Sequence, residues 1–188
     1  MSEARDLGRM TYAEYLALEE RSETKHEFRD GRVYDMAGGT PEHARLQARM
    51  IVALSRALAD KPCAPFSSDL RIYVGSARRT AYPDVTVVGD AVAHDPEDAQ
   101  AATNPTLIVE VLSPTTEAED RGAKWQLYQR IPSLRHYVLV AQDRANVEVF
   151  TRTDLGWHYA SHAEGAIRFS ALDAVVSVDE IYAGALAS

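Results

Sequence analysis

Two acidic residues stand in apolar segments whose pattern predicts buried β-strands. Glu110 interrupts the run Leu107-Ile-Val-Glu-Val-Leu112, and Asp84 directly precedes the run Val85-Thr-Val-Val88. A buried carboxylate is costly unless it meets a partner or a metal ion. If the two strands are neighbours, both carboxylates could bind one divalent cation such as Mg²⁺, which prefers oxygen ligands. A cation held in this way can activate water and clamp a phosphodiester.

Each acidic residue also has an ordinary interpretation. Asp84 can be a turn residue at the head of a strand, and Glu110 can reach water or pair with an arginine. A third acid, Glu27, lies in the segment Lys25-His-Glu-Phe-Arg29, and an exposed strand face often carries such alternating charges. The residues by themselves leave these alternatives open.

The elements around these acids predict an α/β or α+β domain with a mixed sheet. Capping residues and apolar periodicity predict helices at 11–22, 41–59 and 117–130 and near 181. The turn Asp30-Gly31 predicts a hairpin of strands 25–29 and 32–36. Further strands are expected at 64–67, 70–74, 81–88, 107–112, 134–141, 147–153, 157–161 and 166–169, with a turn at 75–80 and a surface loop at 89–105. The helix after strand 107–112 could be a right-handed crossover, which would make strands 107–112 and 134–141 parallel.

Length and composition favour one domain. The chain has 188 residues, of which 46% are hydrophobic and 26% charged, as in ordinary globular proteins. Residues 1–10 are expected to be a flexible tail and residues 11–188 a single domain. No apolar run approaches the roughly 20 residues of a membrane span, and no signal peptide is visible. The single cysteine, Cys63, cannot form an internal disulfide and favours a reducing, cytoplasmic compartment.

Charge limits the way in which this chain could bind nucleic acid. The net charge of −8 argues against coating nucleic acid by bulk charge, but a local basic groove remains compatible with it. Two groups of basic residues could flank the acids as a positive rim, one around the hairpin turn expected at 75–80 and one in the helix at 117–130. They are Arg71, Arg78 and Arg79, and Arg121, Lys124 and Arg130.

An ordered set of motifs resembles a known group of enzymes. Pro83-Asp84, followed by Glu110 after an apolar run, resembles the PD-(D/E)XK nuclease superfamily. Most of the chain is similar to the Uma-type restriction endonuclease family within it. The matching stretches include Tyr12-Ala-Glu-Tyr-Leu16, Lys25-His-Glu-Phe-Arg-Asp-Gly31, Met36-Ala-Gly-Gly-Thr40 with His43, Ser68-Asp-Leu-Arg71, Tyr82-Pro-Asp-Val-Thr-Val-Val88, Val109-Glu-Val-Leu-Ser-Pro-Thr115 and Asp120-Arg-Gly-Ala-Lys124 with Tyr128.

The resemblance implies a restriction-endonuclease-like fold, in which helices flank a mixed central sheet, with an N-terminal helix and β-hairpin. It maps Asp84, Glu110 and Glu27 to an acidic site for Mg²⁺ or Mn²⁺. One position departs from the superfamily pattern, because Leu112 stands where a catalytic lysine is usual. Members of the superfamily can carry this lysine on a neighbouring helix, and Lys124 is the candidate here. His43 is expected to support the site from the helix at 41–59.

The resulting hypothesis is a metal-dependent endonuclease that hydrolyses phosphodiester bonds of nucleic acid, with DNA as the expected substrate. A homodimer is expected by analogy with restriction enzymes. A second hypothesis is a catalytically silent module on the same fold that binds nucleic acid or protein, which Leu112 and the net charge favour. A third is a metal-dependent hydrolase of a smaller phosphate ester.

Overall fold

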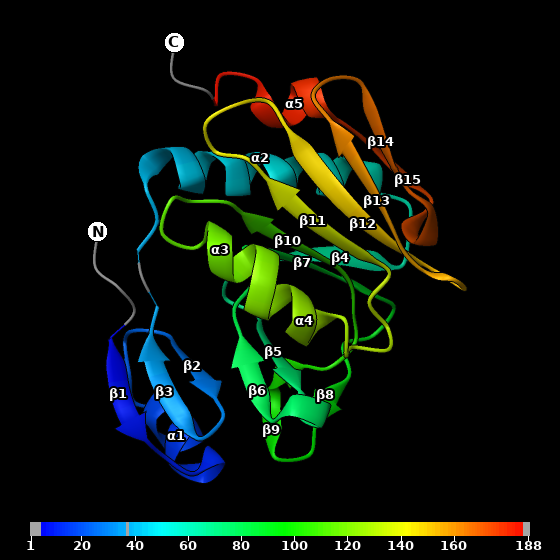
Figure 1. Cartoon of the computed structure of the whole chain (residues 1–188). Coiled ribbons are helices and arrows are strands. Elements are labelled where there is room, and N and C mark those ends of the chain that lie inside the picture. The colour runs from blue at the N-terminus through cyan, green and yellow to red at the C-terminus, as the bar shows by residue number, and fades with distance from the viewer. Residues whose placement is uncertain (1–4, 37, 186–188) are drawn as a thin grey trace.

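A computed structural model of the chain describes residues 5–36 and 38–185. Its centre is a six-stranded mixed sheet in the order β13-β12-β11-β10-β7-β4 (Figure 1). These strands are β4 (Cys63–Ser67), β7 (Val85–Gly89), β10 (Pro105–Val111), β11 (His136–Val140), β12 (Val147–Thr153) and β13 (Gly156–His162). Helices flank this sheet, so the mixed architecture expected from the sequence is confirmed.

The two strands at the centre of this sheet are parallel, as the crossover prediction requires. Leu107 of β10 pairs with His136 of β11, and the register continues to Val111 and Val140. The connection between them runs through α3 (Glu117–Glu119), a π-helical turn (Asp120–Lys124) and α4 (Trp125–Tyr128). The predicted helix at 117–130 is therefore present, but it is shorter and contains a π-helical turn.

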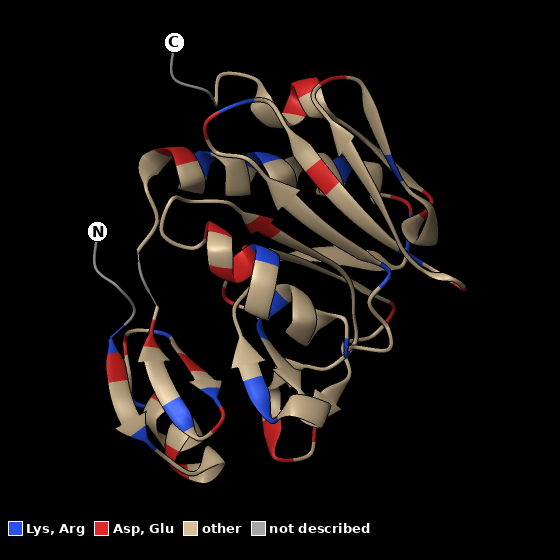
Figure 2. Cartoon of the chain, viewed as in Figure 1, with Lys and Arg blue, Asp and Glu red and all other residues tan. Residues whose placement is uncertain are grey.

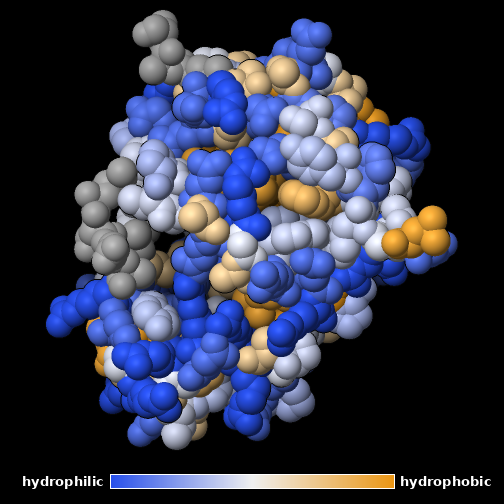
Figure 3. Space-filling model, in the orientation of Figure 1, coloured by the Kyte–Doolittle hydropathy of each residue, from blue (hydrophilic) through white to orange (hydrophobic). Residues whose placement is uncertain are grey.

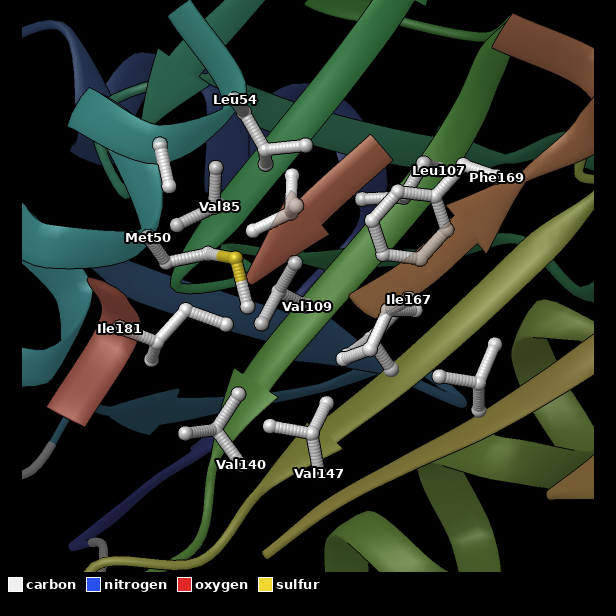
Figure 4. Packing of buried hydrophobic residues seen from close by; sticks show 14 of the residues in the cluster. Met50, Leu54, Val85, Leu107, Val109, Val140, Val147, Ile167, Phe169 and Ile181 are labelled. Atoms are coloured by element: carbon white, nitrogen blue, oxygen red, sulfur yellow. The ribbon is translucent and has the colours of Figure 1, made fainter. Parts of the chain in front are cut away.

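One face of the sheet is covered by α2 (Pro41–Ala57), α5 (Val178–Tyr182) and the ribbon of β14 (Ala166–Phe169) and β15 (Ala174–Ser177). Leu46, Met50 and Leu54 lie at intervals of four along α2 and are fully buried, because this spacing keeps them on one face of a helix. Figure 4 shows Met50 and Leu54 packing near apolar side chains of β7 and β10.

The opposite face carries a second core under α4. It contains Ile108 and Leu112 beside Tyr128 and Tyr137. Trp125 stacks on Tyr137 with ring centroids 5.3 Å apart. Leu112 is buried among apolar side chains, so the position that carries a lysine in the superfamily is here part of the core.

The N-terminal part forms a small sheet with one helix, and a third sheet lies next to it. β1 (Asp6–Arg9), β3 (Arg32–Asp35) and β2 (His26–Arg29) pair in that order, with α1 (Tyr12–Glu19) beside them. Asp30 and Gly31 have φ of 51° and 79°, which confirms the predicted hairpin turn. The third sheet has the order β6-β5-β9-β8, with β5 (Arg71–Val74), β6 (Arg79–Ala81), β8 (His94–Asp95) and β9 (Asp98–Ala102).

The structure differs from the sequence expectations in several elements. Part of the expected tail forms β1, which pairs with β3, whereas residues 1–4 lie outside the described residues. The expected strand 81–88 divides into β6 and β7 around Pro83, and the expected loop 89–105 contains β8 and β9. The strand expected at 166–169 is β14, and it pairs with β15, for which no strand was expected. Within the described residues, no helix is long and apolar enough to cross a bilayer.

Candidate functional site

The structure brings Asp84 and Glu110 to adjacent strands. Val85 of β7 lies opposite Val109 of the antiparallel strand β10, so Asp84 stands opposite Glu110 one step further along. Oδ2 of Asp84 accepts a hydrogen bond of 2.7 Å from the backbone N–H of Val111. This bond fixes the Asp84 carboxylate beside the end of β10.

Glu110 is buried and is contacted by two side chains from the helical segment above it. It is only 2% exposed. The Tyr128 hydroxyl donates to its Oε1 at 2.8 Å, and Nζ of Lys124 lies 3.1 Å from its Oε2. Burial raises the pKa of Glu110 well above its ordinary value, and the charge of Lys124 opposes this rise.

The π-helical turn places a second buried acid in the same cluster. Asp120 is 1% exposed, and its Oδ1 lies 2.9 Å from Nζ of Lys124. This oxygen accepts no hydrogen bond with regular geometry from the described residues. Burial alone would lower the pKa of Lys124, but Glu110 and Asp120 raise it well above its ordinary value. π-Helical turns are rare and frequently occur at functional sites. In Figure 2, acidic and basic positions of this segment lie close to an acidic position of β10.

His43 joins the cluster from the first turn of α2. Thr40 caps this helix by accepting a hydrogen bond from the backbone N–H of His43 at 3.2 Å. Nε2 of the imidazole lies 3.2 Å from Oδ2 of Asp84. Burial opposes protonation, but the adjacent Asp84 carboxylate raises the pKa of His43 above its ordinary value. A Cβ atom at Gly39 would lie 2.9 Å from Nδ1 of His43, so this close approach depends on a glycine.

Glu27 lies nearby but has a different partner. Its carboxylate accepts a hydrogen bond of 2.9 Å from Nε of Arg29, and Arg29 also pairs with Glu119. Glu27 and Arg29 line a cavity of about 10 Å³ together with Lys124. That volume holds about one water molecule.

In the described part of the chain, the side chains are not arranged as a complete set of metal ligands. Among these residues, no three Asp, Glu, His or Cys side chains gather closely enough to hold a metal ion. The ammonium group of Lys124 instead lies against Glu110 and Asp120. The chemistry of the donors nevertheless fits a hard divalent cation, because they are carboxylates.

Two residues of this cluster stand in a matched motif but were given no role from the sequence, and a third residue, Gln142, lies beside the cap of α2. Asp120 precedes Lys124 by four positions and Tyr128 follows it by four. That spacing, which places side chains on one helix face, was the available signal. Gln142 donates to Oγ1 of Thr40 at 2.9 Å, and its buried Oε1 has no hydrogen-bond partner among the described residues. Nothing in the sequence pattern pointed to Gln142.

Two members of the expected positive rim are engaged elsewhere. Arg71 is buried and pairs with Asp98, with Nη2 2.7 Å from Oδ1. Arg121 pairs with Glu148, with Nη2 2.6 Å from Oε1. The rim predicted from spacing is therefore smaller than expected.

Comparison with known proteins gives consistent results. A family model described as "Uma2: Putative restriction endonuclease" matches residues 12–176. Two uncharacterized proteins of Synechocystis are similar in sequence: slr1290 is 36% identical over 91% of this chain and 90% of its own length. The second, sll1609, is 34% identical over 79% of this chain and 84% of its own length. A crystal structure described as a "putative nuclease belonging to DUF820" from Anabaena variabilis superposes with a TM-score of 0.69 at 13% identity, covering 88% of this chain and 93% of that one.

Proposed function

This chain belongs to the Uma2 family, whose model is described as "Putative restriction endonuclease". We propose that it is a metal-dependent endonuclease that hydrolyses phosphodiester bonds of DNA. The family and the shared fold support a nuclease-like role. One observation carries the finer proposal, namely that Lys124 lies 3.1 Å from Glu110 although Leu112 occupies the usual lysine position. A lysine from the following helical segment thus restores the set of two acids and one cation.

The residues of the cluster have distinct roles in this proposal. Asp84 and Glu110 would hold Mg²⁺ or Mn²⁺, and that ion would supply Lewis acidity for the activation of water. Lys124 stabilises the negative charge that develops on the phosphate. Glu27, which borders the same small cavity as Lys124, positions water there. His43 orients the Asp84 carboxylate through their 3.2 Å contact.

The charges of the cluster support binding of a cation. The negative charges of three carboxylates, from Asp84, Glu110 and Asp120, are offset only in part by Lys124 and by His43, an imidazole whose pKa is raised. The pKa of Glu110 remains raised by burial in spite of the adjacent ammonium group. The ionised form of Glu110 is therefore incompletely compensated, and a divalent cation would stabilise it.

Calorimetric titration with Mn²⁺ and Mg²⁺ tests the site directly. The native protein is expected to bind the ion, while Asp84→Asn and Glu110→Gln are expected to abolish this binding and all cleavage without unfolding the protein. Asp173→Asn is the matched control, because Asp173 is exposed and pairs with Lys61 on the surface. Native affinity and native cleavage rates in both site variants would exclude this site.

Assays on single- and double-stranded DNA and RNA identify the substrate. Cleavage of DNA supports the proposal, whereas binding of nucleic acid without metal binding or cleavage would favour the catalytically silent module. We also propose a cytoplasmic homodimer. Light scattering of the purified protein tests the dimer, and a monomer at working concentration would contradict it.

A further inference from the structure

A second hollow, larger than the one beside Lys124, lies between the N-terminal hairpin and α4. Its volume is about 340 Å³, at the lower end of the range of roughly 300–1,000 Å³ for ligand sites. Arg79, Arg130, Gln126 and Asp30 contribute its polar groups, and Leu127 contributes to its apolar lining. In Figure 3, apolar surface is visible between hydrophilic side chains where Figure 1 places β6 and α4.

This hollow continues the candidate site. Arg79, Ala123 and Leu127 line both the hollow and the small cavity that Lys124 and Glu27 border. If the scissile bond of a linear polymer lies at Lys124, the monomer units next to that bond would therefore lie in or near the hollow.

The charges of the hollow favour an anion. A guanidinium nitrogen of Arg79 donates to Oδ2 of Asp30, and the charge of Arg130 also helps to hold the pKa of Asp30 below its ordinary value, after the larger effect of Arg79. Asp30 itself is exposed and lies at the tip of the β2–β3 turn. The Asp30 carboxylate is thus an anion that already lies near two arginines. Because its turn is exposed, another anion could displace it.

We propose that this hollow binds a backbone phosphate of the nucleic acid next to the scissile bond, with Arg79 and Arg130 as its ligands. The proposal rests on the proposed nuclease function. Guanidinium groups bind phosphate through paired hydrogen bonds, and the Asp30 carboxylate occupies the anion position until a phosphate replaces it. Since a phosphate carries no base information, this subsite contributes affinity and register but no sequence preference.

Fluorescence anisotropy with a labelled 12-nucleotide single-stranded DNA in EDTA tests the subsite without cleavage. Arg130→Gln is expected to lower the slope of log affinity against log salt by about 0.7, which corresponds to about fivefold weaker binding at 0.1 M salt. Asp30→Asn is expected to strengthen binding, because the competing charge is removed. Asparagine tolerates the left-handed conformation of residue 30, so the turn is retained.

Arg168→Gln is the matched control. Arg168 lies on β14, its side chain is 70% exposed and it pairs with an exposed Asp173, so its loss is expected to leave DNA binding unchanged. If the native protein binds and cleaves DNA while Arg130→Gln and Asp30→Asn bind as the native protein does, the subsite is overturned and the nuclease proposal stands. If the native protein neither binds nor cleaves DNA, both are overturned.

Discussion

Replacing Lys124 by methionine is expected to destabilise the protein strongly and in a pH-dependent manner. The Lys124 ammonium lies 3.1 Å from Glu110 and 2.9 Å from Asp120. Methionine approximates the length of the lysine stem but removes the charge. Two nearly inaccessible carboxylates would then lack their shared cation.

The magnitude follows from these distances. At an effective dielectric constant of about 20, each contact corresponds to roughly 5–6 kcal/mol of attraction. Desolvation of the ions offsets much of this attraction, and removing one partner of a buried pair costs about 3–5 kcal/mol in practice. We therefore expect the free energy of unfolding to fall by about 3–5 kcal/mol at pH 8.

The pH dependence has a definite sign. The pKa of Glu110 is already raised in the folded protein, and loss of the lysine charge raises it further. A carboxyl group with a raised pKa contributes its full stability below the unfolded-state pKa and loses it as the pH rises through the folded-state pKa. The defect should therefore be small near pH 5 and grow toward pH 8, by at most about 1.4 kcal/mol per pH unit for one proton.

Urea unfolding of native and variant protein at pH 5, 6.5 and 8 measures these differences. Lys61→Met is the control, since Lys61 pairs with the exposed Asp173 and such pairs contribute at most about 1 kcal/mol. Combining Lys124→Met with Glu110→Gln should recover part of the stability, because glutamine is neutral and retains an oxygen for Tyr128. A loss below about 1 kcal/mol at pH 8, or the same loss at pH 5 and 8, would refute this reasoning.

Three further predictions concern the same structure. In an NMR titration, Asp84→Asn should lower the pKa of His43, because the Asp84 carboxylate raises it. In the native protein, the stability that this pair contributes is present below pH ~6.5 and is lost as the pH rises through the raised pKa of His43. An unchanged pKa of His43 in the variant would contradict the pairing. Tyr128→Phe should lower the free energy of unfolding by about 1–3 kcal/mol in urea titrations, since the Tyr128 hydroxyl is a donor to buried Glu110, and an unaltered midpoint would argue against that bond. Burial lowers the pKa of His136 to about 4, so native stability should fall by up to about 3 kcal/mol between pH 6.5 and 4, and His136→Gln should weaken this dependence if the prediction is correct.

Local patterns in the sequence determined much of the framework. The intervals of four from Leu46 to Leu54 fixed the buried face of α2, and Asp30-Gly31 fixed the hairpin turn, because both depend on short-range geometry. The apolar runs around Asp84 and Glu110 also marked two strands that carry acids. Their position in adjacent strands agrees with the restriction-endonuclease-like fold that the motifs implied, and the structural likeness confirms that fold.

The surroundings of these acids were decided by the tertiary structure alone. Lys124 was a candidate from the sequence, but only the crossover and its π-helical turn bring it to Glu110 and Asp120. Arg29, which pairs with Glu27, and Arg71, which pairs with Asp98, could not be assigned partners from spacing. Some of these pairs join segments that are far apart in the chain. Others depend on whether the fold leaves a charged side chain in contact with water or buries it against a charge of opposite sign. A short sequence window contains neither kind of information, so only the assembled fold determines which charges are neutralised and which remain available for binding.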